Sequence, residues 1–276
     1  MNLDFPAFLV AATFLTGIIW LIDALFFASK RQQGNLDSEN PAVREPLLVE
    51  YSKSFFPIIL AVLVLRSFIV EPFRIPSGSM MPTLLVGDFI LVNKFSYGIK
   101  LPVINKKIIE IGEPERGDVV VFKYPQNPRV DYIKRVVGVP GDNIGYQHKV
   151  LYVNGSPQEQ KQVGIYSGVG SGIGQTGSME SVESLGDREH NMLVNPLAPD
   201  FGYGCQFLMR GPITVPPGHY FVMGDNRDNS NDSRCWGLVP EQNLVGEAFG
   251  IWMSWDSNRS WSPLPVAWGR IGEGIN

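Results

Sequence analysis

The chain begins with two long apolar segments and then changes to short alternating runs separated by turn residues. The first segment, residues 3–28, is almost entirely apolar and long enough to cross about 30 Å of hydrocarbon as a helix. The second, Phe55–Val70, would be roughly 24 Å long as a helix and stops at Glu71. We predict transmembrane helices in residues 1–28 and 55–71.

The distribution of basic residues predicts how these helices are oriented. Residues 29–54 carry Lys30, Arg31, Arg44 and Lys53, whereas no basic side chain precedes the first helix. The positive-inside rule therefore makes residues 29–54 a cytoplasmic loop and places residues 72–276 in the periplasm. A cleaved signal peptide would have Lys or Arg before its apolar run, so we expect the first helix to remain as an anchor. For the second segment a buried core helix is the alternative, although Arg66 can extend toward lipid headgroups.

Residues 72–276 have the pattern of a mainly β domain. Short apolar runs are bounded by Gly, Pro and Asn, and no long amphipathic helix is evident. The expected strands are Asp88–Asn93, Gly117–Tyr124, Val130–Val139, Val150–Val153, His219–Met223 and Glu247–Trp252. Residues 147–214 are more polar, which predicts a smaller inserted domain. The glycines of Gly164–Ser178 lack the strand-then-helix context of a nucleotide-binding loop, so we expect a surface loop there.

Composition and charge exclude several classes of function. With 276 residues, 44% of them hydrophobic, and a net charge of −4, the chain can form a full core and lacks the basic bias of nucleic-acid-binding proteins. No pair of His or Cys has metal-ligand spacing, so we expect no metal and no other cofactor. Asp228, Ser230 and Asp232 alternate like the ligands of a calcium loop. Such a loop needs Gly and Glu where this chain has Ser233 and Val239, so that interpretation fails.

The strongest candidate for chemistry is the octapeptide Pro76-Ser77-Gly78-Ser79-Met80-Met81-Pro82-Thr83, which follows the second apolar segment. Its prolines restrict the backbone on both sides and its glycine permits a tight bend. Two hydroxyls one residue apart, with a backbone N–H between them, suit a nucleophile that has its own oxyanion donors. An ordinary linker leaving a membrane helix has a similar composition. The remaining segments must decide between the two.

A serine nucleophile needs a base, and the three histidines are poor candidates. His148 and His190 fall in the polar insertion, where we expect them to be solvated. His219 could form a triad-like cluster with Asp225, but a strand residue after a turn is the simpler interpretation.

Lys134 is the better candidate for the base. Strand alternation puts it on the same face as Tyr132 and Val136, while Arg135 points the other way. The pKa of a free Lys is near 10.4, so a neutral amine at pH 7 to 8 requires a pKa lowered by about 2 to 3. Burial beside Tyr132 can provide this, and Arg135 adds like charge. An edge-strand lysine with a solvent-exposed amine remains the alternative.

A third segment, Gly224–Arg234, is dense in short polar side chains. A hydrophilic turn would have the same composition. The segment can also support a site, because a hydroxyl such as Ser230 can orient an amine. Asp232 and Arg234 can form a bidentate pair that fixes the turn.

Taken together, these segments resemble the bacterial type I signal peptidases, or leader peptidases, which are membrane-anchored Ser/Lys endopeptidases. Four motifs stand in the family's order: Pro76–Leu84, Arg116–Phe122, Tyr132–Val136 and Gly224–Ser230. The resemblance covers most of the chain after Phe55. Each motif is weak by itself, but the combination is highly specific.

The resemblance implies roles for individual residues. Ser79 would be the nucleophile and Lys134 the general base, with the Ser77 hydroxyl and the Ser79 N–H forming the oxyanion hole. Ser230 would position the lysine amine, and Asp232 and Arg234 would support it. The positions matching the family's shallow substrate pockets are Ile75, Pro76, Met80, Leu84, Tyr132 and Ile133.

The resemblance also implies a fold and a substrate. The expected fold is two transmembrane helices followed by a catalytic domain of coiled antiparallel sheets, with a smaller inserted β-rich domain. The expected substrates are exported preproteins with an Ala-X-Ala site, bound as an extended strand at the surface of the phospholipid bilayer. We expect a monomer. A non-catalytic, membrane-tethered peptide-binding module is the alternative function.

Two features stay open at the level of sequence. Cys205 and Cys235 are the only cysteines, and either a disulfide or two free thiols fits the spacing. The tryptophans of the C-terminal part, Trp252, Trp255, Trp261 and Trp268, could contact the membrane interface or pack in the core.

Overall fold

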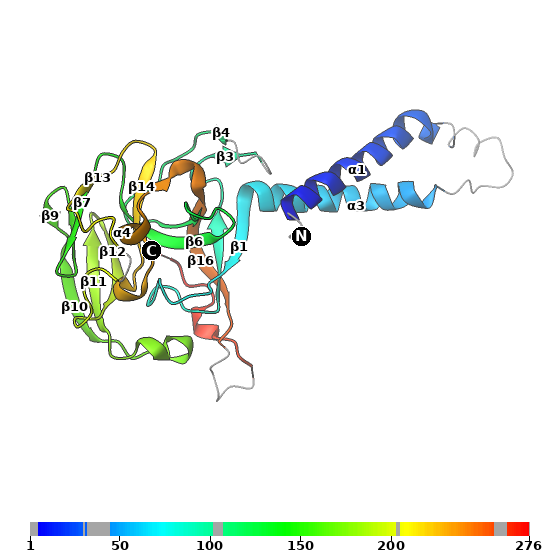
Figure 1. Ribbon diagram of the computed structural model, residues 1–276. Coiled ribbons are helices and arrows are strands. Elements are labelled where there is room, and N and C mark those ends of the chain that lie inside the picture. The colour runs from blue at the N-terminus through cyan, green and yellow to red at the C-terminus, as the bar shows by residue number, and fades with distance from the viewer. Residues whose placement is uncertain are drawn as a thin grey trace. The chain divides into compact units, whose positions relative to one another are not determined.

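The computed structural model describes residues 5–29, 31, 45–101, 107–202, 205–256 and 264–275. These divide into two compact units, one comprising residues 1–70 with 100–108 and the other residues 71–99 with 109–276. We call them the helical unit and the β unit. Figure 1 shows the helices and strands of each.

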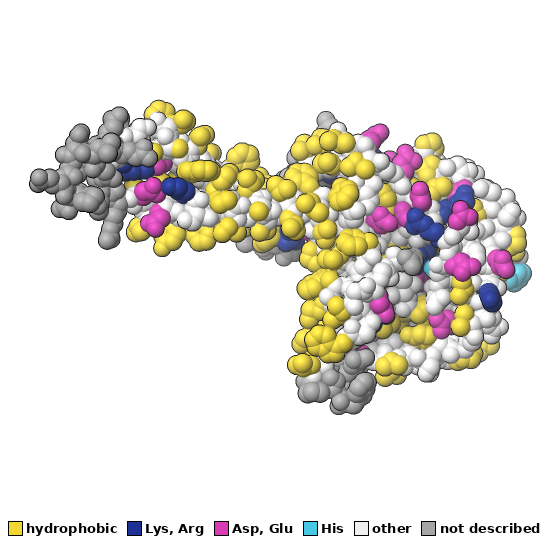
Figure 2. Space-filling view, turned by 180° about the vertical axis from the view of Figure 1, so that it is seen from behind, with side chains coloured by type: hydrophobic (Ala, Val, Ile, Leu, Met, Phe, Trp, Pro, Cys, Tyr) yellow, Lys and Arg dark blue, Asp and Glu magenta, His cyan; other side chains and the backbone are white. Residues whose placement is uncertain are grey.

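The helical unit contains two apolar helices, α1 (Phe5–Phe26) and α3 (Leu47–Val64), with a π-helical turn, Leu65–Ile69, continuing α3. Both helices are long and apolar enough to cross a membrane. Apolar side chains cover most of their surface (Figure 2), as a lipid environment requires. α3 begins at Leu47, before the predicted start at Phe55, and the candidate span Leu47–Ile69 ends before Val70 and Glu71, which lie in a strand.

A glycine allows the two helices to pack closely. A Cβ at Gly17 would lie 2.8 Å from the ring of Phe56, so the ring occupies the space that any larger residue would fill. The rings of Trp20 and Phe56 are 5.4 Å apart. Near the end of α1, Asp23 accepts two hydrogen bonds from Arg31, each 2.5 Å long.

The β unit is built on one seven-stranded sheet in the order β1-β2-β16-β5-β6-β14-β15. Its strands are β1 (Val70–Arg74), β2 (Asp88–Asn93), β5 (Val119–Lys123), β6 (Asp131–Gly138), β14 (His219–Met223), β15 (Val239–Pro240) and β16 (Leu244–Ser254). The pairs from β2 to β15 are antiparallel. Register shifts along β16, at Leu244/Gly246, Ala248/Gly250 and Ile251/Met253, let this long strand bend, which curls the sheet. This confirms the predicted mainly β architecture.

Both faces of the sheet are covered, which explains the uninterrupted apolar run in β5. Val119 and Val121 belong to one core cluster, with Ile90, Val92 and Leu84. Val120 and Phe122 belong to another, with Val136, Tyr220 and Val222. Alternate residues of a strand point to opposite faces, so a strand buried on both sides is apolar throughout.

The polar stretch predicted as an insertion carries two further sheets. One has the order β13-β7-β8-β9 and the other β10-β11-β12. Their strands are β7 (Asn143–Gln147), β8 (Val150–Val153), β9 (Ser156–Pro157), β10 (Gln160–Ile165), β11 (Met179–Leu185), β12 (Arg188–Val194) and β13 (Ile213–Thr214). A separate two-stranded sheet pairs β3 (Ile99–Lys100) with β4 (Lys107–Ile109). The strands β10–β12 gave no alternating apolar signal, because several buried positions, such as Ser181, Glu183 and His190, are polar.

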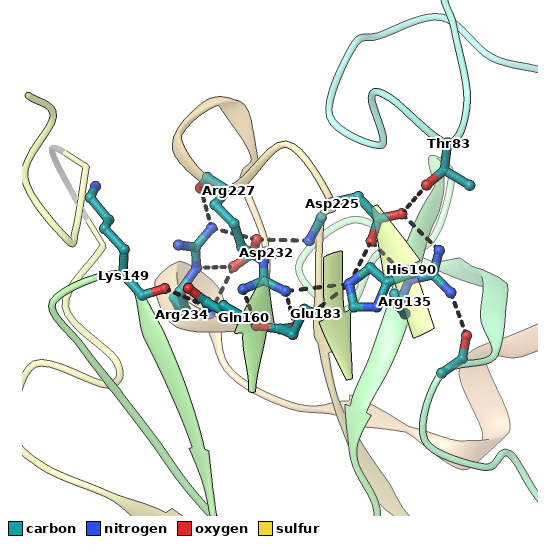
Figure 3. Close-up of polar contacts among 12 residues, drawn as sticks. Thr83, Arg135, Lys149, Gln160, Glu183, His190, Asp225, Arg227, Asp232 and Arg234 are labelled. Atoms are coloured by element: carbon teal, nitrogen blue, oxygen red, sulfur yellow. Dashed lines mark hydrogen bonds and ion pairs between the residues drawn. The ribbon is translucent and has the colours of Figure 1, made fainter. Parts of the chain in front are cut away.

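A buried polar cluster joins these insertion strands to the turn after β14 (Figure 3). Glu183 on β11 accepts two hydrogen bonds from Arg227, one of them 2.8 Å long. His190 on β12 has its Nε2 atom 3.6 Å from Glu183 and 3.7 Å from Asp225. Asp225 in turn accepts from Arg135 on β6, at 2.8 and 2.9 Å. The cluster thus links three parts of the chain through paired charges.

The prediction that His190 is solvated was wrong, since the residue is only 6% exposed. Burial, with a smaller contribution from the cations of Arg135 and Arg227, lowers the pKa of His190 to about 4 against the opposing effect of Asp225 and Glu183. The imidazole is therefore neutral at pH 7. His148, by contrast, is exposed as predicted.

Acid is expected to destabilise the β unit through His190. The pKa of His is near 6.5 in an unfolded chain but about 4 here, so unfolding takes up a proton between these values and stability rises with pH. The free energy of unfolding should fall by up to about 3 kcal/mol between pH 6.5 and 4 because of this group. Urea unfolding of the detergent-solubilised chain at several pH values measures this.

His190→Gln should remove most of this pH dependence, whereas His148→Gln, at an exposed turn, serves as the matched control. An equal slope of stability against pH in wild type and His190→Gln would contradict the assignment.

Candidate active site

Ser79 and Lys134 meet in the β unit although they are far apart in sequence. The Lys134 Nζ atom donates to Ser79 Oγ at 2.7 Å and to the carbonyl oxygen of Ile133 at 2.8 Å. Both side chains are buried, with exposed fractions of 7% for Ser79 and 4% for Lys134. The amine lies 5.5 Å from the centre of the Tyr132 ring, as strand alternation predicted. A hydroxyl and an amine at this distance can exchange a proton directly.

Burial lowers the pKa of Lys134 to about 8. The carboxylates of Asp232 and Asp225 oppose this shift, while the guanidinium of Arg234 adds to it. Arg135, which the sequence suggested as the neighbouring cation, is instead directed to Asp225. A substantial fraction of the amine is therefore neutral near pH 8.

The turn after β14 contacts the backbone of Gly78 and Ser79. The Asn226 N–H donates to the Ser79 carbonyl at 3.1 Å, and its side-chain amide donates to the Gly78 carbonyl at 3.0 Å. Ser77 Oγ lies 3.4 Å from Ser79 Oγ, so the two hydroxyls stand side by side as expected. Thr83 also reaches this turn and donates to Asp225 at 2.5 Å. Sequence reasoning missed Asn226 and Thr83, although both belong to the motifs it singled out.

Gly224 allows the turn to approach Ser79 closely. A Cβ at this position would lie 2.3 Å from Ser230 Oγ and 2.4 Å from the Ser79 carbonyl oxygen, distances that no side chain tolerates. Ser230 Oγ is buried and makes no hydrogen bond of regular geometry with the described residues. It lies in the same cleft as Lys134.

Asp232 and Arg234 form the expected bidentate pair, with contacts of 2.9 and 2.8 Å. Asp232 also accepts from the Gly224 N–H at 3.0 Å, and Arg234 donates to the Arg227 carbonyl at 2.5 Å. Burial raises the pKa of Asp232, but Arg234 and the hydrogen bonds from Gly224 and Ser230 outweigh it and lower the pKa overall. The carboxylate stays charged and fixes the turn.

A cleft of about 750 Å³ is lined by Ser79 and Lys134. Of the predicted substrate-binding residues, Pro76, Tyr132 and Ile133 line it. Ile75, Met80 and Leu84 instead lie in the buried cluster against which Ile133 packs.

One edge of β6 is open beside the cleft. β14 pairs with β6 only at Arg135, Val136 and Gly138. Within the described residues no strand pairs with that edge over Asp131–Lys134, and all four of these residues line the cleft. An extended peptide can add there as a further strand.

The structure resolves both features that the sequence left open. Cys205 and Cys235 form a disulfide that lines the cleft. Trp252, Trp255 and Trp268 are exposed by 44%, 43% and 65%, which excludes full burial in the core. Trp261 lies outside the described residues.

Comparison with known proteins agrees with this geometry. The family model for "Signal peptidase, peptidase S26" matches residues 48–255. The chain is 50% identical to a signal peptidase I of Pseudomonas aeruginosa over 99% of each chain, and 51% identical to one of Pseudomonas fluorescens over 92% of this chain and 94% of that one. A signal peptidase I of Aquifex aeolicus is 38% identical over 72% of this chain and 82% of its own.

Among solved structures, a signal peptidase I from Enterococcus faecalis is 28% identical and covers 50% of this chain and 98% of its own. Its TM-score is 0.31, and we base no conclusion on that likeness.

The apolar helices, the curled sheet and the paired serine and lysine define a membrane-anchored serine peptidase. The chain belongs to the signal peptidase family, peptidase S26. It is a serine endopeptidase that uses the family's Ser/Lys dyad to remove signal peptides from exported preproteins. The alternative of a non-catalytic peptide-binding module is not favoured.

Gly224→Ala is expected to lower kcat about a hundredfold with little change in KM, because the new methyl must displace Ser79 or Ser230 by an ångström or so. Preprotein cleavage kinetics measure this. Gly174→Ala is the matched control, since a Cβ there meets nothing within 4 Å. An unchanged kcat in Gly224→Ala would contradict this prediction, because it would show that the turn accommodates the methyl group without displacing Ser79 or Ser230.

The pH profile should report the Lys134 amine. In the role that the family resemblance implies for Lys134, the neutral amine is the base, so kcat/KM should rise about tenfold per pH unit below pH 8 and level off above it. Lys134→Arg should be inactive at every pH, since a guanidinium does not lose its proton in this range. A rise centred near the ordinary pKa of histidine would point to another base.

Proposed function

We propose that Ser79 is the nucleophile and Lys134 the general base. The observation that carries this is the 2.7 Å hydrogen bond between Lys134 Nζ and Ser79 Oγ, made by a buried amine whose pKa is lowered to about 8. A charged lysine could hold the hydroxyl but could not take its proton. A neutral one can do both.

The reaction follows from this geometry. Neutral Lys134 takes the Ser79 proton as Oγ attacks the scissile carbonyl, and the Ser77 hydroxyl and the Ser79 N–H donate to the oxyanion. Lys134 then gives the proton to the leaving amine of the mature protein, and the signal peptide remains as an ester on Ser79. Water, deprotonated by Lys134, hydrolyses this ester and restores both groups. Ser230 orients the amine, while Asp232 and Arg234 hold the turn that carries Ser230.

The substrate site suits an extended chain with small side chains next to the bond. The residues before the scissile bond add to the open edge of Asp131–Lys134 as a strand. Pro76, Tyr132 and Ile133 bound shallow pockets whose floor is formed by Ile75, Met80 and Leu84. Because these floor residues are fixed in the core, the pockets admit Ala better than a larger side chain. An Ala-X-Ala site fits this description.

The enzyme acts at the outer face of the inner membrane. The helices Phe5–Phe26 and Leu47–Ile69 span the bilayer, the segment between them is cytoplasmic, and residues 72–276, with the insertion at about 147–214, are periplasmic. Ser79 follows Val70 by nine positions in the sequence, which limits how far the serine can lie from the end of the second membrane helix. Exposed Trp252, Trp255 and Trp268 can contact the membrane interface. The chain works as a monomer.

Cleavage of a purified preprotein with an Ala-X-Ala site by the detergent-solubilised chain tests this function. Wild type should cut after the second Ala, and Ser79→Ala and Lys134→Ala should each lower kcat at least about a thousandfold. A preprotein with Leu in place of both Ala residues should resist cleavage.

Ser156→Ala and Lys161→Ala, at exposed positions on β9 and β10, are the matched controls and should cleave like wild type. Activity that survives in Lys134→Ala would overturn its role and return attention to His219.

A further inference from the structure

Part of the cleft lining has no role in the proposed reaction. These residues include Gly202, Cys205, Asp228, Asn229, Asn231 and Cys235, which we call the cleft wall. They come from the stretch after β12, from the turn between β14 and α4 (Ser233–Trp236), and from α4 itself. We propose that the cleft wall, fixed by the Cys205–Cys235 disulfide, binds the first residues of the mature protein, beyond the scissile bond. This inference rests on the proposed roles of Ser79 and Lys134.

The first step concerns where the scissile peptide bond of the substrate lies relative to the open edge of β6. The edge ends at Lys134, because β14 occupies the next position by pairing Met223 with Arg135. Ser79 Oγ is hydrogen-bonded to Lys134 at this same end. A substrate strand that follows Asp131–Lys134 up to the scissile bond cannot continue along β6. The residues after the bond must leave the sheet and meet the remaining lining of the cleft.

The second step is the chemistry of the cleft wall. Asn229 and Asn231 are exposed, and Asp228 and the glycine at 202 add further polar groups. Such groups hydrogen-bond to a peptide backbone and select no particular side chain. Mature proteins begin with varied sequences, so a wall that binds the backbone of an extended peptide suits them better than a deep pocket.

The third step is how the stretch before Gly202 is anchored. Lys149, in the turn between β7 and β8, donates to the Pro199 carbonyl at 2.8 Å and also pairs with Asp228. Asp228 accepts from the Asn195 N–H at 2.7 Å, and Asp200 accepts from the His148 N–H at 2.6 Å. These contacts hold residues 195–200 beside the turn that follows β14.

The disulfide extends this anchoring to the cleft itself. Cys205 follows the anchored stretch, and its partner Cys235 lies on α4, whose first residues are capped by Asp232. The bond therefore ties one side of the cleft wall to the rigid turn that carries Ser230. Without it, Gly202 and Cys205 would sample more conformations, and a bound peptide would have to order them.

Two peptide substrates separate this role from support of the dyad. Both carry the same signal region and Ala-X-Ala site; one ends a single residue past the bond, and the other continues about six residues, roughly 20 Å extended. For the full-length wild type, the extension should lower KM about three- to tenfold. In Cys205→Ser/Cys235→Ser the ratio of the KM of the short peptide to that of the long peptide should fall to about one. Leu197→Ala, a 95% exposed side chain in the same stretch, should keep the gain.

Wild type treated with a thiol reductant provides a second test without mutation and should behave like the double variant. The inference fails if the disulfide-free enzyme keeps the gain from the extension. It also fails if cleavage of both peptides falls equally, since the disulfide would then support the dyad. Failure of the proposed function looks different: wild type would cut neither peptide, or Ser79→Ala would still cut them.

Discussion

The site depends on one buried amine. Lys134 is almost fully desolvated beside Ser79, and desolvation is the largest influence on its pKa. Two carboxylates, Asp225 and Asp232, would keep the amine charged if they were free to act on it. Each is instead paired with an arginine, Arg135 for the first and Arg234 for the second, so its field at the amine is largely compensated. The two buried ion pairs thus reduce the effect of both carboxylates on the Lys134 amine.

These ion pairs belong to a larger cluster of buried charges that connects strands β11 and β12 to the turn after β14. Glu183 and His190, on insertion strands, contact Arg227 and Asp225 on that turn. Buried charges are costly to desolvate, and pairs of them are weak evidence for added stability. Their value here is geometric, because each partner fixes the direction of the next. The insertion is therefore part of the framework that positions Asn226 and Ser230, as well as a covering layer.

The turn after β14 also fixes the site by approaching the backbone of Ser79 closely. Gly224 leaves no room for a side chain between Ser79 and Ser230, and the Asn226 amide locks the Gly78 carbonyl from the same turn. Two segments more than a hundred residues apart are held in contact by the backbone N–H and the short side chain of Asn226. Such contacts define position more sharply than long side chains do, because a backbone and a short side chain have fewer rotamers to order.

The sequence by itself determined whatever depends on local pattern. The apolar runs gave the two membrane helices, and alternation gave strands such as Asp88–Asn93, Val150–Val153 and His219–Met223 with their observed limits. It also singled out Ser79 and Lys134, since a nucleophile segment and an inward-facing lysine have recognisable local chemistry. Strands β10–β12 escaped prediction because their burial does not follow an alternating apolar pattern: β10 has no buried residue, and the buried positions of β11 and β12 mix polar residues such as Glu183 and His190 with apolar ones such as Leu185 and Met192. His190, the Cys205–Cys235 bond and the open edge of β6 were decided by the tertiary structure, because each depends on which distant segment lies beside it.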